Sequence, residues 1–135
     1  MTDLIYALIQ LGHNFGALAV TGIPVAALAR EGVDGRYSRR LMLWLVAAWA
    51  LQVASGSGFA LASWTLKGAL PEVEGIALVA LSVKIGATVI GLGTAIVVAA
   101  RAGRWTAPGR RTMYQFEIVV ALVPLAAAAF LRWYL

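Results

Sequence analysis

The chain has no cysteine, a single histidine and few charged residues. Without cysteine there is no disulfide, thiolate-bound metal, iron–sulfur cluster or thiol redox chemistry. Charged residues make up 13% of the 135 positions and hydrophobic residues 61%, and the mean hydropathy is +0.84. This composition is typical of a membrane protein and leaves no room for a separate soluble domain.

Four apolar segments are long enough to cross a bilayer, which takes about 20 residues in a helix. We place them near residues 5–29, 41–64, 75–100 and 113–134. The expected fold is therefore all-α, an antiparallel four-helix transmembrane bundle that forms one integral membrane domain over residues 1–135.

Most of the charged residues are arginines, and they gather in two of the three loops. Four precede the second segment and four precede the fourth: Arg30, Arg36, Arg39, Arg40, Arg101, Arg104, Arg110 and Arg111. Because cytoplasmic loops are enriched in basic residues, we expect these two loops in the cytoplasm and both termini outside, in a cell's inner (cytoplasmic) membrane. The pI of about 10.3 then follows from topology and does not indicate a nucleic-acid partner.

The two halves of the chain share a pattern that aligns without a gap. The order Ala-Arg-x-Gly followed by Arg-Arg-x-Met occurs in residues 29–42 and again in residues 100–113. A true repeat makes two parallel helical hairpins, related by a pseudo-two-fold axis along the membrane normal. The topology requires basic loops in any case, so duplication and chance similarity both stay open. In this register His13 falls opposite Lys84.

Polar residues interrupt the apolar segments at one depth. Counting about 1.5 Å per residue, His13 lies about 12 Å below the outer end of its helix and Lys84 about 13 Å below that of its own. Ser55 lies at a similar depth, with Gln52 one turn deeper. Ionisable residues inside a bilayer are costly and usually functional. The candidate ligand- or cofactor-binding residues are Gln10, His13, Asn14, Gln52, Ser55 and Lys84.

Lys84 is too deep for its side chain to reach the outer surface. No carboxylate is expected at its depth, so it needs another partner. Either a ligand supplies an anion, such as a haem propionate or a lipid headgroup, or Lys84 faces a water-filled depression and hydrogen-bonds to Ser55 or to a backbone carbonyl. Both interpretations stay open.

His13 has three interpretations. It hydrogen-bonds Gln52 or Ser55, it carries a proton, or it presents an imidazole nitrogen to a haem iron. Small residues on either side, Gly12 and Gly16, favour a planar ligand but equally favour close helix packing.

His13-Asn14 with its small neighbours, in a four-helix topology, resembles bacterial four-helix b-type cytochromes and copper-resistance D-like membrane proteins. A bis-histidine site requires a second histidine, which this chain lacks, so the resemblance does not carry haem or copper binding over. If haem b is bound, His13 is its iron ligand. The second ligand then comes from Lys84, from His13 of a second copy, or from a partner subunit.

Three functions follow from these patterns. The first is a haem- or quinone-linked electron-transfer membrane subunit, the second a non-catalytic structural or assembly subunit, and the third a small transporter or proton or anion pathway. We expect contact with the lipid bilayer and assembly as a homo-oligomer or within a larger membrane complex. No catalytic residue is predicted, since there is no nucleophile motif, phosphate loop or pair of carboxylates, and the chain is not expected to be an enzyme on its own.

Overall fold

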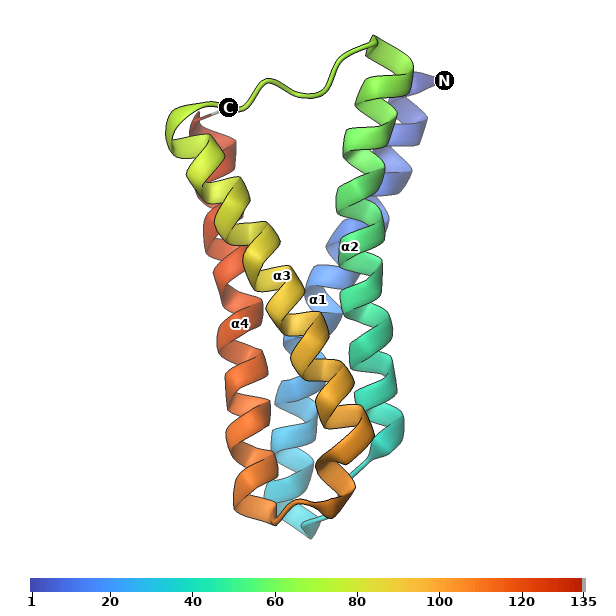
Figure 1. The fold of residues 1–135 in the computed structure, drawn as a ribbon. Helices are drawn as coiled ribbons and strands as arrows, with labels where there is room; N and C mark the ends of the chain where they lie inside the picture. Colours follow the sequence, from blue (N-terminus) through green and yellow to red (C-terminus); the bar gives the residue numbers. More distant parts are fainter. Residues whose placement is uncertain (135) are drawn as a thin grey trace.

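The computed structural model describes residues 1–134, and four long helices account for most of them (Figure 1). They are α1 (Thr2–Asp34), α2 (Arg39–Lys67), α3 (Gly75–Arg101) and α4 (Ala107–Tyr134), with a short 3-10 helix, η1 (Ala102–Arg104), after α3. No strand occurs in this part of the chain. All four long helices have the length and hydropathy to span a membrane. The expected all-α, four-helix fold of a multi-pass membrane protein is confirmed.

The helix ends that differ most from the expected spans are the end of α1 and the start of α4. α1 continues past residue 29 to Asp34 and ends where Gly35 adopts a φ of 65°, with its N–H donating to the carbonyl of Glu31. Glycine suits this left-handed position because it has no Cβ. α4 already begins at Ala107 and not near residue 113. Glu31 and Arg110, which were expected in loops, are therefore carried by helices.

The helices form two antiparallel hairpins, α1–α2 and α3–α4 (Figure 1). In addition α1 packs against α4, and α2 packs against α3. The arginine-rich connections lie at one end, which we call the arginine end. The start of α1, the end of α4 and the α2–α3 loop lie at the other, which we call the open end. The hairpins converge toward the arginine end and diverge toward the open end (Figure 1).

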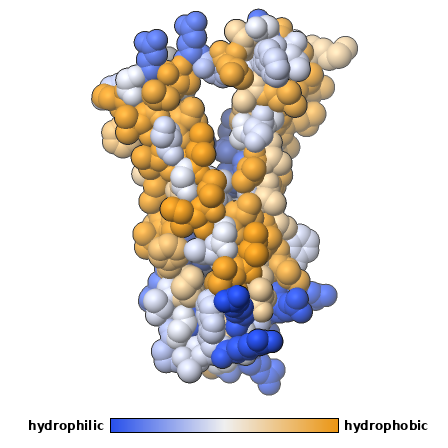
Figure 2. Space-filling model, viewed as in Figure 1, coloured by the Kyte–Doolittle hydropathy of each residue, from blue (hydrophilic) through white to orange (hydrophobic). Residues whose placement is uncertain are grey.

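The outer surface of the bundle is apolar. Figure 2 shows hydrophobic residues over the middle of the molecule and strongly hydrophilic residues gathered at the arginine end. Large apolar side chains such as Phe15, Val89 and Val119 are mostly exposed. A surface of this kind is stable when hydrocarbon and not water surrounds it, so these helix faces contact the lipid bilayer.

The buried faces of α1 and α3 correspond in the expected register. His13 and Lys84 are separated by 71 positions. At that same separation the buried residues Gly16, Val20, Pro24, Ala27 and Glu31 correspond to Ala87, Gly91, Ala95, Val98 and Ala102, which are also all buried. The first and third helices therefore present equivalent faces to the interior.

The buried faces of α2 and α4 correspond only when the separation is one position longer than the 71 positions that relate α1 to α3. In that register the buried residues Met42, Leu45, Ala48 and Trp49 correspond to Tyr114, Glu117, Val120 and Ala121, all buried. The gapless alignment of the two arginine pairs is therefore wrong as a structural equivalence, because Arg39 is exposed whereas Arg110 is buried. Duplication of a hairpin stays a prediction.

The hairpins meet where the indole ring of Trp49 on α2 lies against Gly91 on α3. Trp49 is 1% exposed. A Cβ atom added to Gly91 would overlap the ring atoms Cε2, Cζ2 and Cη2 of Trp49. Small residues allow such close helix contacts in membranes, so glycine is required here by the size of the facing ring.

We expect Gly91→Ala to destabilise the bundle by about 1–3 kcal/mol, the usual cost of overpacking a filled interior, because Trp49 or the whole of α3 must move. Gly93→Ala is the matched control, since a Cβ there meets no atom within 4 Å. Unfolding of both variants by titration of a denaturing detergent measures the difference. Equal stability of the two variants would contradict the packing role of Gly91.

Candidate functional site

His13, Ser55 and Lys84 come from three helices and meet in one hydrogen-bonded chain. His13 Nδ1 lies 2.7 Å from Ser55 Oγ, and His13 Nε2 lies 3.1 Å from Lys84 Nζ. The Ser55 hydroxyl donates in turn to the carbonyl of Leu51, over 2.7 Å. His13 and Lys84, which the sequence places at one depth and opposite each other in the repeat register, are thus in direct contact.

The order of donors in this chain assigns the protonation of His13. The Lys84 ammonium can only donate, so His13 Nε2 carries a lone pair and accepts a hydrogen from it. The hydrogen of the neutral ring is then on Nδ1, which donates to the Ser55 hydroxyl oxygen, and Ser55 gives its own hydrogen to a backbone carbonyl of its helix. His13 is therefore the neutral tautomer with its proton on Nδ1.

Gln52 contacts the backbone of His13 and not its ring. Gln52 Nε2 donates to the His13 carbonyl over 2.7 Å. Gly16 makes room for this amide, because a Cβ added to it would overlap Gln52 Nε2. Phe59 packs edge-on against the imidazole, with ring centroids 5.9 Å apart. The ring of His13 is thus held by Ser55, Lys84 and Phe59, and its backbone by Gln52.

Gln10 and Asn14 are the two expected site residues that do not join this network. Gln10 Nε2 donates to Asn14 Oδ1 over 2.7 Å, on an exposed part of α1. Both side chains line the cavity next to His13. They lie at the edge of the site, whereas His13, Gln52, Ser55 and Lys84 form its interior, the His13–Lys84 cluster.

A cavity of about 480 Å³ lies beside the His13–Lys84 cluster, between the hairpins. All four helices line it, and most of its wall is apolar, with Val20, Phe59 and Leu125 among its residues. Arg132, close to the open end of α4, also lines it. Figure 2 shows the molecule hollowed between its two halves toward the open end.

A second cavity, of about 450 Å³, shares part of its lining with the first. Gln52, Phe59, His13 and Lys84 line both, and the second is completed by residues of α2 and α3 that include Thr88. Because the same two ionisable side chains reach both spaces, the His13–Lys84 cluster separates one from the other.

Lys84 has no carboxylate partner in the described part of the chain. The ion pairs found within residues 1–134 are Arg30–Asp34 and Arg110–Glu31. The contact that the structure gives to Lys84 Nζ is His13 Nε2. A cation in apolar surroundings needs a countercharge or water. The described side chains around Lys84 supply no negative charge.

The His13–Lys84 contact does not fit a haem iron held between these two residues. Bonds from a metal to an imidazole nitrogen are about 2 Å long, so two axial nitrogens on one iron would lie about 4 Å apart. The two nitrogens here are 3.1 Å apart, and Ser55 occupies the other ring nitrogen. Within residues 1–134 no group of three or more His, Asp or Glu side chains is arranged to hold a metal ion.

A second polar group lies deeper in the bundle, and the sequence patterns did not identify it. Trp49 Nε1 donates to Glu117 Oε2 over 3.0 Å, and Thr94 Oγ1 contacts Glu117 Oε1. Along α3, Thr94 lies about 15 Å from Lys84 toward the arginine end. We call these three residues the Glu117 cluster; it supplies the partner that the buried indole of Trp49 needed.

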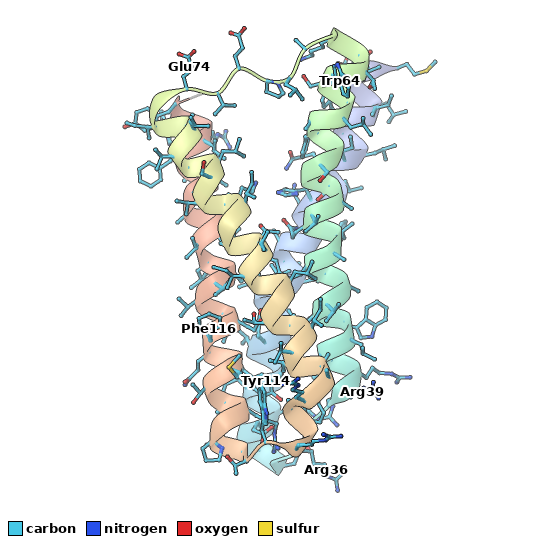
Figure 3. All side chains as sticks on the ribbon, in the orientation of Figure 1. Arg36, Arg39, Trp64, Glu74, Tyr114 and Phe116 are labelled. Atoms are coloured by element: carbon cyan, nitrogen blue, oxygen red, sulfur yellow. The ribbon has the colours of Figure 1, made fainter. Side chains whose placement is uncertain are left out.

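A buried ion pair joins α1 to α4 at the arginine end. Arg110 Nε donates to Glu31 Oε2 over 3.0 Å, and Arg110 Nη2 donates to Glu31 Oε1 over 2.5 Å. The guanidinium also donates to the Trp105 carbonyl over 2.7 Å. Tyr114 points inward from α4 nearby, whereas Phe116 points away from the bundle (Figure 3). The arginine end is thereby closed by charged and aromatic groups.

Tyr37, in the connection between α1 and α2, adds to this closure. The single hydrogen of its hydroxyl is shared between the carbonyls of Val98 and Ala99, which lie 3.2 and 3.3 Å from the oxygen. Burial raises the pKa of Tyr37, although the guanidinium groups of Arg39 and Arg110 act in the opposite direction. The phenol therefore stays protonated and can donate at neutral pH.

No family model, curated protein or solved structure matches this chain. The resemblance to b-type cytochromes and copper-resistance D-like proteins therefore stays a prediction.

We expect ¹⁵N NMR of the protein labelled at its single histidine to show a protonated Nδ1 and an unprotonated Nε2 at neutral pH. Ser55→Ala removes the acceptor of the Nδ1 hydrogen, so the preference for this tautomer should weaken to the share that the hydrogen bond from Lys84 maintains. Ser57→Ala is the matched control, because this serine is exposed on the same helix. A protonated Nε2 in the unaltered protein would contradict the assigned order of donors.

Proposed function

We propose that the protein is a small membrane transporter that binds an amphipathic anion in the cavity between its hairpins. The observation that carries this proposal is Lys84, a cation on a membrane-spanning helix that lines the cavity and has no carboxylate partner within residues 1–134. The anionic group of the ligand would supply the missing countercharge. Its apolar part would occupy the apolar remainder of the cavity.

The charges of the cavity lining favour an anion over a cation. The basic residues Lys84 and Arg132 line the cavity, and among the described residues no Asp or Glu does. A cleft with basic side chains and apolar walls concentrates negative ligands. An amphiphile with one negative group, a carboxylate or a phosphate, matches both properties of this lining.

The shape of the bundle supports access from one side. The hairpins diverge toward the open end (Figure 1), while Glu31 and Arg110 join α1 to α4 at the other end. From the excess of arginines we assign the arginine end to the cytoplasm and the open end to the outside of an inner membrane. A site open to one side and closed to the other is one of the two states that alternating access requires.

A structural or assembly role is the second candidate. The hydrogen bonds that join Lys84, His13 and Ser55 favour it, because they tie three helices together without any ligand. In that case substitutions in the His13–Lys84 cluster change stability or assembly and leave no binding activity to lose.

A haem- or quinone-linked electron-transfer role is the third candidate, and only the resemblance supports its haem version. We expect no Soret band in absorbance spectra of the oxidised and reduced protein, purified after expression with ample haem, since Ser55 and Lys84 already occupy both ring nitrogens of His13. A Soret band that disappears in His13→Ala would overturn this expectation and the transporter proposal with it.

Binding of a fluorescent long-chain fatty carboxylate by the protein in phosphatidylcholine nanodiscs tests the transporter proposal. We expect Lys84→Met to weaken binding at least tenfold, which corresponds to about 1.4 kcal/mol, because the countercharge is lost. Lys67→Met is the matched control, since this other lysine lies exposed at the end of α2 and should leave binding unchanged. The methyl ester of the probe should bind weakly to all three proteins.

A second arm replaces the fatty carboxylate by phosphatidylglycerol and so separates a carboxylate from a phosphate ligand. Proteoliposomes then show whether the ligand that binds also crosses the membrane, and Lys84→Met should abolish its flux. If neither amphiphile binds the unaltered protein, the transporter proposal is wrong, and a purely structural effect of Lys84→Met then supports the second candidate.

A further inference from the structure

Glu117 is a buried carboxyl group that the proposed anion site does not use. Its side chain is 0% exposed. Trp49 reaches Oε2 from α2, and Thr94 reaches Oε1 from α3. An indole N–H can only donate, so Oε2 of Glu117 accepts a hydrogen bond.

The Thr94 contact is compatible with a protonated Glu117 as well as with a carboxylate. The Thr94 hydroxyl has one hydrogen, which can go to Glu117 Oε1 or to the carbonyl of Ile90, 2.9 Å away, which can only accept. When Thr94 donates to Ile90, its contact with Glu117 Oε1 needs a hydrogen on that carboxyl oxygen. A neutral acid then donates through Oε1 and accepts through Oε2, and every polar atom of the Glu117 cluster has a partner.

An ionised Glu117 would lack a countercharge. α2 presents Trp49 and α3 presents Thr94, neither of which is charged. Going outward from the level of Glu117, the ionisable residues are His13, Arg30 and Glu31 on α1, Arg40 and Lys67 on α2, Lys84 and Arg101 on α3, and Tyr114, Arg111, Arg110 and Arg132 on α4. Of these, the Arg110 guanidinium is already held by Glu31, and within residues 1–134 no ion pair includes Glu117. A buried, uncompensated carboxylate is costly, so the neutral acid is the stable form here.

We propose that Glu117 is a membrane-embedded proton-binding site that holds its proton in this conformation. The indole of Trp49 covers the carboxyl group on one side and lines the 480 Å³ cavity on the other. Water from the cavity reaches Glu117 only when this ring withdraws, so the position of Trp49 controls release of the proton.

The same ring links the proton site to the cavity, and this link rests on the proposed function. A ligand that displaces Trp49 changes the proton occupancy of Glu117, and by linkage the proton changes the affinity for that ligand. The protein would then be a proton-coupled transporter of the amphipathic anion, with the two sites about 15 Å apart along α3.

Infrared spectroscopy of the reconstituted protein tests the proton site without any ligand. The chain has six Asp and Glu residues. Apart from Glu117 they are exposed or paired with arginine: Asp3, Glu31, Asp34, Glu72 and Glu74. We therefore expect one protonated-carboxyl C=O band at pH 7, which shifts in D₂O, is lost in Glu117→Gln and is retained in the exposed control Glu72→Gln.

Glu117→Gln is suited to this test because an amide also offers one acceptor to Trp49 and a donor to Thr94, so the variant should keep its helicity and unfold near the wild type. Absence of the band from folded wild-type protein at pH 7, or its persistence in Glu117→Gln, would overturn the proton site.

The link to the cavity has its own readout. Raising the pH should remove the carboxyl band. Adding the fatty carboxylate probe should shift the pH at which the band disappears in the unaltered protein, but should leave that pH unchanged in Lys84→Met. A bound probe that leaves this pH unchanged would overturn the coupling and leave the proton site standing. Failure of the probe to bind is instead a failure of the proposed function, and the ligand-free band still decides the proton site.

Discussion

A polar side chain inside a bilayer finds no bulk water, so its partner must come from the protein itself. This constraint explains how the bundle is held together. At three depths a polar group on one helix meets a partner on another: Lys84 with His13, Glu117 with Trp49, and Arg110 with Glu31. Sliding any one helix by a single residue would break such contacts, so these contacts fix the register of the helices. Apolar helix faces in lipid provide little specificity for one register over another.

The depth of each polar side chain in the bundle could be predicted from the sequence, whereas the direction in which it points could not. A helix rises by a constant distance per residue, so counting from the helix ends placed His13, Ser55 and Lys84 in one layer, and the structure brings them into contact. Which atom bonds to which depends on the rotation of each helix about its axis. That is why Gln52 reaches the backbone of His13 and not its ring, and why Gln10 bonds to Asn14.

The deeper polar groups escaped prediction for different reasons. Trp49 and Glu117 both lie about 15 Å from the starts of their helices, so the depth count used for His13 also pairs them once α4 is known to begin at Ala107. The Glu31–Arg110 pair has no comparable signal. Both residues belong to basic stretches that look like loops, and they become buried partners only because α1 extends to Asp34 and α4 starts early.

The two hairpins differ at the centre of the bundle, where His13 on α1 faces Lys84 on α3. α1 and α3 bury equivalent positions, yet one carries His13 where the other carries Lys84. Two ammonium groups can only donate and would repel each other, whereas a neutral imidazole accepts the hydrogen that an amine donates. The unequal pair can therefore close directly across the centre, at 3.1 Å. Because the two side chains are in contact, no gap remains between them in which a symmetric pair would hold a metal. The space for a ligand lies instead in the two cavities that flank the His13–Lys84 cluster. This asymmetry is the physical reason why we propose an anion beside Lys84, and not an iron between two nitrogens, as the ligand.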